Sequence, residues 1–362
     1  MSRRVSPPLP PALLLAFGLA LPLAGCAGTS STGPITPDWA GFAPAGGPEV
    51  PADRSPLGLE HDTTTLVDPA RRDALLADLY AAYAAHAADP DNEDGLIWLG
   101  RRLAYLGRYR DAVAVYTEGL ARHPDSVKLL RHRGHRSITL LRFDDAVADL
   151  SRAAQLIEGT PDEVEPDGAP NASGLPRSTL HSNIDYHLGL AHFLRGEWAA
   201  ARAAYERGYE ASRVNDDMLV ATSWWLYLTL GISGERELAD AVLLPIRGNM
   251  DVLENHAYHD LLLMARGERT AEQVLEGVEP GSLEYATRGY GLSWLLRWQG
   301  RRFEEAAELL LTIVESDAWP SFGAIAAEVE LGRIPTDAPA VGPDAPADMS
   351  ARIAQYWFEM VF

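Results

Sequence analysis

Apolar residues recur along most of this chain at the spacing of helices that bury one face. Between residues 67 and 331 the apolar positions are separated by three or four residues, and glycine or proline interrupts them at short intervals. In the first run, Asp68 and Pro69 provide an N-cap and a first helical residue, and an apolar stripe follows from Leu75 to Tyr83. The pattern predicts short amphipathic helices joined by turns, and therefore an all-α fold.

Small residues recur at fixed positions in these helices. Three glycine–alanine pairs share a separation of twelve residues: Gly100 and Ala112, Gly134 and Ala146, Gly189 and Ala201. We expect each glycine to face its alanine where two antiparallel helices approach closely, because a larger side chain would push them apart. The first two pairs are offset by thirty-four residues, which is the period of the tetratricopeptide repeat.

The chain therefore resembles tetratricopeptide repeat proteins, most closely in residues 93–126, 127–158 and 182–213. The second of these segments departs from the family pattern, with Arg133 where leucine is usual. Weaker helix pairs follow, each with a glycine at its turn: Gly234, Gly267 and Gly300. The resemblance implies a right-handed α-solenoid over residues 67–331.

Three stretches lie outside the repeat pattern. Residues 159–180 have no helical period and contain four prolines. Insertions in solenoids emerge as loops on one face, so this one is either an idle surface loop or part of the working surface. Residues 332–348 are predicted to be a linker, and residues 349–362 a helix that docks on the last face of the solenoid or in its groove.

Residues 1–25 have the pattern of an export signal, with Arg3 and Arg4 before a short apolar run. The run ends in Leu-Ala-Gly followed by Cys26, which resembles the lipobox of bacterial lipoproteins. That resemblance implies lipid attachment at Cys26 and, with alanine rather than aspartate next, a protein held on the outer membrane and facing the periplasm. Residues 26–66 are rich in Gly, Pro, Ala, Ser and Thr and are predicted to be a disordered tether.

Composition excludes several classes of function. The formal net charge of −20 repels phosphate backbones, so we expect no nucleic-acid partner. Cys26 is the only cysteine, which excludes an intrachain disulfide and a cysteine-based zinc site. The chain contains no Walker loop, no Gly-x-Ser-x-Gly, no His-Glu-x-x-His and no dinucleotide fingerprint. We therefore expect no enzymatic activity and no cofactor.

Two polar clusters have a chemical and a structural interpretation. Histidines with i, i+3 spacing could share a metal, or could simply pack: His132 with His135, and His256 with His259. Neither pair has a third ligand at fixed spacing, and we predict no metal site. Asn215, Asp216 and Asp217 directly precede an apolar run, so we expect them to cap a helix rather than to act as paired carboxylates.

In tetratricopeptide proteins fixed positions of each first helix line a concave groove. Mapped onto this chain, these positions predict a groove that is basic at its N-terminal end and aromatic further along. The residues expected to contact a peptide are Arg101, Lys128, Arg131, His135, Tyr186, Trp224, Tyr290 and Trp294. This distribution suits an extended peptide with an acidic or C-terminal carboxylate end. In the alternative, the arginines pair with acidic residues of neighbouring repeats and the aromatic residues are buried.

These features predict a membrane-anchored adaptor that recruits a protein or peptide partner in the periplasm through its groove. The alternative is a cell-envelope enzyme, or an enzyme subunit, with a site formed by the insertion, His181 and His187. A deep pocket with convergent polar groups at the insertion would favour the enzyme, and an open concave face the adaptor.

Overall fold

The computed structural model describes residues 55, 57, 69–166, 174, 176–300, 302–335 and 349–361. Fifteen α-helices and one π-helical turn make up most of these residues, and they contain no β-strand. The predicted all-α class is therefore confirmed. Cys26, the export signal and nearly all of the predicted tether lie outside the described residues. None of the helices described combines the length and the apolar character needed to cross a membrane.

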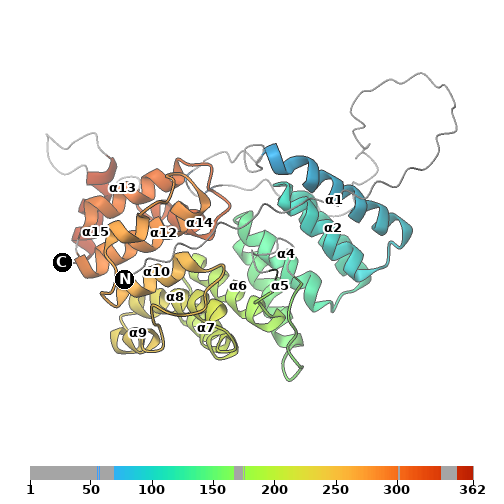
Figure 1. Cartoon of the computed structure of the whole chain (residues 1–362), viewed down its shortest axis with the longest axis horizontal. Coiled ribbons are helices and arrows are strands. Elements are labelled where there is room, and N and C mark those ends of the chain that lie inside the picture. Colours follow the sequence, from blue (N-terminus) through green and yellow to red (C-terminus); the bar gives the residue numbers. More distant parts are fainter. Residues whose placement is uncertain are drawn as a thin grey trace, which may run out of the picture. The chain divides into compact units, whose positions relative to one another are not determined.

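The helices follow one another in the order of the sequence and pack against their sequence neighbours (Figure 1). Those of the first part are α1 (Pro69–Ala88), α2 (Glu93–Tyr105), α3 (Tyr109–Arg122), α4 (Val127–Thr139), α5 (Phe143–Leu156), α6 (Leu180–Arg195) and α7 (Trp198–Ser212). The pairs α2–α3, α4–α5 and α6–α7 form the three repeats predicted best from the sequence, which confirms the solenoid of tetratricopeptide-type helix pairs.

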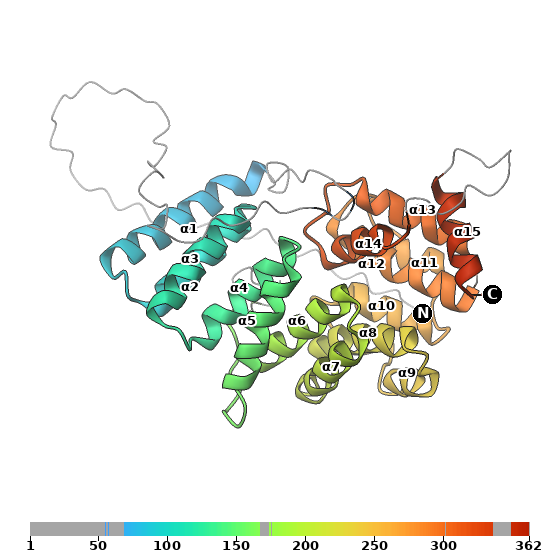
Figure 2. The same ribbon diagram turned by 180° about the vertical axis from the view of Figure 1, so that it is seen from behind.

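The second part has shorter and less regular elements. They are α8 (Asp216–Ile232), α9 (Arg236–Leu243), α10 (His256–Ala265), α11 (Ala271–Leu275), α12 (Leu283–Leu295), the π-helical turn η2 (Leu296–Gly300), α13 (Phe303–Val314), α14 (Phe322–Gly332) and α15 (Met349–Val361). In both views α13 and α15 lie side by side (Figure 2). Ile353 and Trp357 of α15 are buried there, and Arg297 lies 4.2 Å from the centre of the Trp357 ring.

The first helices of the pairs begin where the sequence supplies a cap. Asn92 accepts a hydrogen bond from the backbone N–H of Gly95, and Asn215 accepts one from Met218. Thr179 forms a capping box with Ser182 at the start of α6. These side chains satisfy N–H groups that a helix leaves without a partner, so the predicted cap at residue 215 is confirmed.

Close packing of the helix pairs depends on the predicted glycines, although not through their alanines. A Cβ atom at Gly100 would lie 2.2 Å from the ring of Tyr116, and one at Gly134 would lie 2.6 Å from Leu150. The large side chain one turn beyond the alanine, and not the alanine itself, fills the space above each glycine. The expectation that Gly100 directly faces Ala112 is corrected accordingly.

The departure from the family pattern at residue 133 has a structural reason. Arg133 of α4 forms two hydrogen bonds, both of 2.7 Å, with the buried carboxylate of Asp149 in α5. The usual leucine is thus replaced by an ion pair between the two helices of the same repeat.

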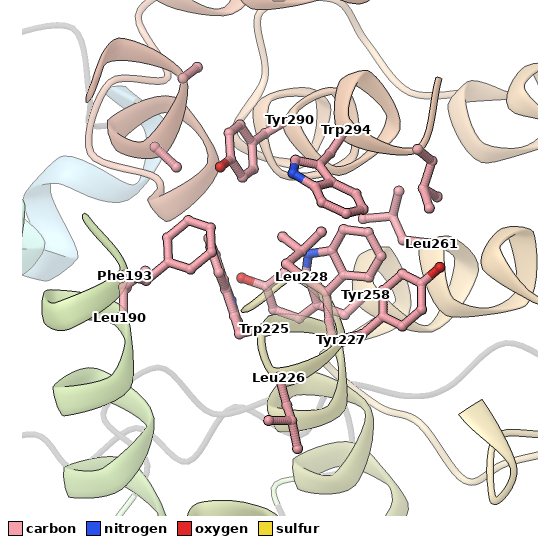
Figure 3. Packing of buried hydrophobic residues seen from close by; sticks show 14 of the residues in the cluster. Leu190, Phe193, Trp225, Leu226, Tyr227, Leu228, Tyr258, Leu261, Tyr290 and Trp294 are labelled. Atoms are coloured by element: carbon pink, nitrogen blue, oxygen red, sulfur yellow. The ribbon is translucent and has the colours of Figure 1, made fainter. Parts of the chain in front are cut away.

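The core of the second part includes aromatic side chains from α8, α10 and α12 that pack against one another (Figure 3). Trp225 of α8 stacks on Tyr290 of α12 with ring centres 6.1 Å apart. Trp224 and Leu261 fill the space next to Gly291, where a Cβ atom would lie 2.4 Å from Leu261. This core buries several of the rings that the sequence places at groove positions.

The segment around α14 contacts the first repeats. Trp319 packs edge-on against Tyr109 at the start of α3, with ring centres 5.7 Å apart. Phe322 lies 5.5 Å from the ring of His135 in α4. At the end of α14, Arg333 donates a hydrogen bond of 2.7 Å to the carbonyl of Leu194 in α6. Residues 319–333 therefore join the C-terminal helices to α3, α4 and α6.

Candidate functional site

A polar pocket of about 160 Å³ lies against the face formed by the first helices α2, α4 and α6. Its walls come from α2, α4, both arms of the insertion and the loop before α10. We call it the arginine pocket, after Arg101, Arg131 and Arg177, which line it with Glu165, Ser178 and Glu254. A second pocket of about 320 Å³ shares Arg131, Ser178 and Glu254 and continues toward His135, Tyr186 and Phe322.

Arg131 holds a carboxylate of the insertion. Its Nη2 atom lies 2.8 Å from Oε2 of Glu165, and both side chains are almost fully buried. Asn183 of α6 also donates to Glu165, and Nε2 of His132 lies 3.8 Å from its other oxygen. Arg131, which the sequence places at the basic end of a groove, is therefore paired with a carboxylate of the same chain.

Backbone hydrogen bonds hold the two arms of the insertion together. The N–H of Glu165 donates to the carbonyl of Ser178 at 3.0 Å, and the N–H of Leu180 donates to Glu163 at 2.8 Å. Val164 and Thr179 form an antiparallel bridge between these bonds. Residues 163–165 are thus extended and lie along α4 and α6.

Arg101 has a different environment from Arg131. Its guanidinium lies 4.5 Å from the centre of the Trp98 ring and donates to the hydroxyl of Tyr105 at 3.3 Å. No carboxylate lies within ion-pair distance of Arg101 in the part of the chain that the structure describes. Among the described residues Arg101 therefore has no ion-pair partner, whereas Arg131 is paired with Glu165.

Asp217 fixes the loop that forms the far wall of the pocket. Its buried carboxylate accepts hydrogen bonds from the backbone N–H groups of residues 253–255, at 2.9 to 3.2 Å, and from the side-chain amide of Asn255. Arg177 pairs with Asp251 of the same loop at 2.8 Å. Asn215 thus caps α8, as predicted, whereas the carboxylates of Asp216 and Asp217 bond to the loop that carries Glu254, a role that their sequence context does not reveal.

Three histidines lie on α4 and α6, and two of them, His135 and His187, line the second pocket. The rings of His135 and His187 are 4.2 Å apart, and His132 stacks on Tyr116. Burial, reinforced by nearby arginines, holds the pKa of His132, His135 and His187 well below its usual range. Among the described residues no group of three or more His, Cys, Asp or Glu side chains is arranged to hold a metal ion.

The structure brings together five of the eight residues predicted to contact a peptide. Arg101 and Arg131 line the arginine pocket, and Arg131, His135 and Tyr186 line the second pocket. Lys128 pairs with Glu163 at 3.0 Å, and this hydrogen bond raises the pKa of Lys128. Tyr186 lines the second pocket, and its hydroxyl accepts a hydrogen bond from the indole of Trp225.

The other three predicted contacts are wrong. Trp224 is fully buried, and Tyr290 and Trp294 are only 2% and 8% exposed, all within the hydrophobic core. A first-helix position faces the groove only where the helix stack leaves that face open. Here α8, α10 and α12 pack their aromatic rings against one another, which is the alternative that the sequence left open for these residues.

The histidines proposed for an enzyme do not form one site. His181 contacts Thr160 at 3.2 Å and lines a separate pocket with Asp185 and Arg207. His187 is buried against His135, and its Nδ1 atom contacts the carbonyl of Asn183. The arginine pocket at the insertion has convergent polar groups, as expected of an enzyme, but neither His181 nor His187 lines it.

The lengths, succession and glycine packing of the helix pairs define an α-solenoid of tetratricopeptide type. No protein-family model matches the chain, and no curated protein matches it. Similar solved structures include a tetratricopeptide repeat protein from Parabacteroides merdae ATCC 43184, at 17% identity over 71% of this chain and 94% of that one, with a TM-score of 0.42.

Two further similar structures are those of YrrB and MamA. YrrB, a TPR protein with an unusual peptide-binding site, is 14% identical over 65% of this chain and 91% of its own, with a TM-score of 0.35. MamA is 19% identical over 49% of this chain and 91% of its own, with a TM-score of 0.37. At these identities and scores the likenesses carry no argument about function.

Proposed function

We propose that this protein is a non-enzymatic adaptor that binds an acidic segment of a protein partner on the face formed by α2, α4 and α6. The arginine pocket is the observation that carries this proposal. It gathers three arginines in a protein whose net charge is −20. The Nε atoms of Arg131 and Arg177 are buried and have no acceptor among the described residues. Because these two buried atoms are closed to a partner, its carboxylate would pair with Arg101 instead, which has no carboxylate within ion-pair distance among the described residues.

The fixed walls of the arginine pocket also support the proposal. Asp217 fixes the loop that forms one wall of the pocket, and helices α2 and α4 supply the walls that contain Arg101 and Arg131. A preformed site loses less conformational entropy on binding than a mobile one, which favours recognition of a flexible peptide.

Crosslinking in intact cells tests the adaptor function. A photocrosslinking residue at exposed position 94, on the same helix as Arg101, would capture proteins bound to this face. We expect Arg101→Glu to reduce capture of the partner by roughly tenfold, because a repulsive charge replaces an attractive one. Arg213→Glu is the matched control, since Arg213 is exposed and lines neither pocket. An unchanged set of crosslinked proteins in the Arg101→Glu variant would overturn the proposal.

We also propose that a lipid on Cys26 anchors the protein to the outer membrane, with the solenoid in the periplasm. The lipobox-like sequence before Cys26 supports this. Cells fed a palmitate analogue should label the wild-type protein but not the Cys26→Ser variant. Labelling that persists in the variant would contradict lipid attachment at this residue.

A further inference from the structure

We infer that the ligand of this face is an extended segment with acidic side chains at two alternate positions, and that residues 163–165 of the chain occupy its place until a partner displaces them. The inference rests on the proposed adaptor function. It adds the chemical pattern of the ligand and the means by which access to the site is controlled.

Two matched spacings define the pattern. Lys128 and Arg131 are three residues apart on α4 and therefore project from the same side of the helix. Glu163 and Glu165 are two residues apart in an extended segment, so their side chains share one side as well. The pairs Lys128–Glu163 and Arg131–Glu165 have contact distances of 3.0 and 2.8 Å. The helix is thus built to receive alternate carboxylates.

The two acidic positions differ in importance. The Glu165 side chain is 8% exposed and also accepts from Asn183, whereas that of Glu163 is 52% exposed. A buried, hydrogen-bonded carboxylate discriminates more strongly against a neutral substitute than an exposed ion pair does. The second acidic residue of a partner segment should therefore dominate recognition.

The backbone of the site also suits an incoming extended peptide. The carbonyl of Ser178 and the N–H of Leu180 form the hydrogen bonds that hold residues 163–165. A partner segment in the same place would use these two groups as an added strand does.

Residues 163–165 are held mainly by polar contacts, which makes them displaceable. Val164, between the two glutamates, is 56% exposed, so release of the segment uncovers little apolar surface. The segment is tethered to α5 and competes at a high effective concentration, which for short tethers reaches roughly the millimolar range. Only a partner with the same chemistry and further contacts, such as one with Arg101, would replace it.

Fluorescence polarisation with the purified full-length chain tests the inference. The probe is a labelled peptide with the sequence of residues 160–166, Thr-Pro-Asp-Glu-Val-Glu-Pro, and the control peptide carries Gln in place of both Glu residues. The protein variant Glu163→Gln/Glu165→Gln weakens the internal competitor and keeps Lys128 and Arg131. We expect this variant to bind the probe roughly tenfold more tightly than the wild type does. Adding Arg131→Gln should abolish the gain.

Three results would overturn the inference: no binding of the probe to the Gln variant, equal binding by the variant and the wild type, or equal binding of the probe and the control peptide. Circular dichroism and thermal unfolding verify that each variant is folded. The crosslinking experiment at position 94 separates this inference from the adaptor function. If Arg101→Glu abolishes capture while the probe does not bind, the ligand pattern is wrong and the adaptor function stands. If the probe binds as expected while Arg101→Glu leaves capture unchanged, the adaptor function is wrong.

Discussion

The ring of Phe322, at the first position of α14, lies 5.5 Å from the ring of His135 in α4 and 5.7 Å from that of His187 in α6. Burial, and to a smaller extent the nearby charges of Arg131 and Arg136, lowers the pKa of both imidazoles well below its usual range. The contact between the C-terminal helices and the first repeats is therefore formed by neutral imidazoles next to permanent positive charges.

This contact predicts a loss of stability at mildly acidic pH. The folded protein keeps His135 and His187 neutral because their pKa is lowered, whereas in the unfolded chain they take up protons below pH of about 6.5. The unfolded state then binds more protons, so the free energy of unfolding should fall as the pH falls through 6.5, by up to about 1.4 kcal/mol per pH unit for each histidine. Urea unfolding at pH 7.5 and 5.5 measures this difference.

His135→Phe keeps an aromatic ring against Phe322 and removes one titrating group, so its pH dependence should be weaker than that of the wild type. His256→Gln, which changes an exposed histidine away from this contact, is the matched control. A full wild-type pH dependence in His135→Phe would contradict the assignment.

Two glycines of α2 should respond to alanine in opposite directions. A Cβ atom at Gly100 would lie 2.2 Å from the Tyr116 ring, whereas the nearest atom to one at Gly95, in Asn92, would be at 3.5 Å. Gly100→Ala should lower the free energy of unfolding by about 1–3 kcal/mol through overpacking. Gly95→Ala should raise it by about 0.5–1 kcal/mol through helix propensity. Chemical denaturation of both variants provides the comparison, and equal effects would show that the Tyr116 contact is not the cause.

Trp224 should matter for stability and not for ligand binding. It is fully buried in the core of α8, α10 and α12, so Trp224→Ala should cost about 3–5 kcal/mol of unfolding free energy. The milder variant Trp224→Phe, studied below its melting temperature, should bind the acidic probe peptide with the same affinity as the wild-type protein. Arg101→Gln should do the reverse, with weaker binding and an unchanged melting temperature. A loss of peptide affinity in the folded Trp224→Phe variant would show that Trp224 contacts the peptide, as the groove positions predict.

Asp217 should be far more sensitive to substitution than its neighbour. Asp217→Asn replaces an acceptor of several backbone N–H bonds by a group that brings donors of its own, and should cost about 2–3 kcal/mol. Asp216 accepts one hydrogen bond, from the N–H of Asp251, so Asp216→Asn should cost under about 1 kcal/mol. Thermal and urea unfolding measure both, and similar losses would argue against the role of Asp217 in fixing the loop.

The sequence predicted the helices and the repeats because both depend on local spacing. Caps such as Asn92 and Asn215, and the glycines at 100, 134 and 189, act within one helix pair, and each repeat contacts mainly its neighbours. The basic cluster of Arg101, Lys128 and Arg131 was predictable for the same reason, since it follows from positions on consecutive first helices.

Contacts between residues distant in sequence were decided only by the tertiary structure. No local pattern shows that Glu165 of the insertion pairs with Arg131, that Phe322 packs on His135, or that the rings of α8 and α12 bury one another. Whether a first-helix side chain is exposed depends on what the rest of the chain places over it. The sequence by itself therefore determined the helix pairs and the basic character of the site, and the tertiary structure decided which residues remain accessible and that a carboxylate of the chain already lies among them.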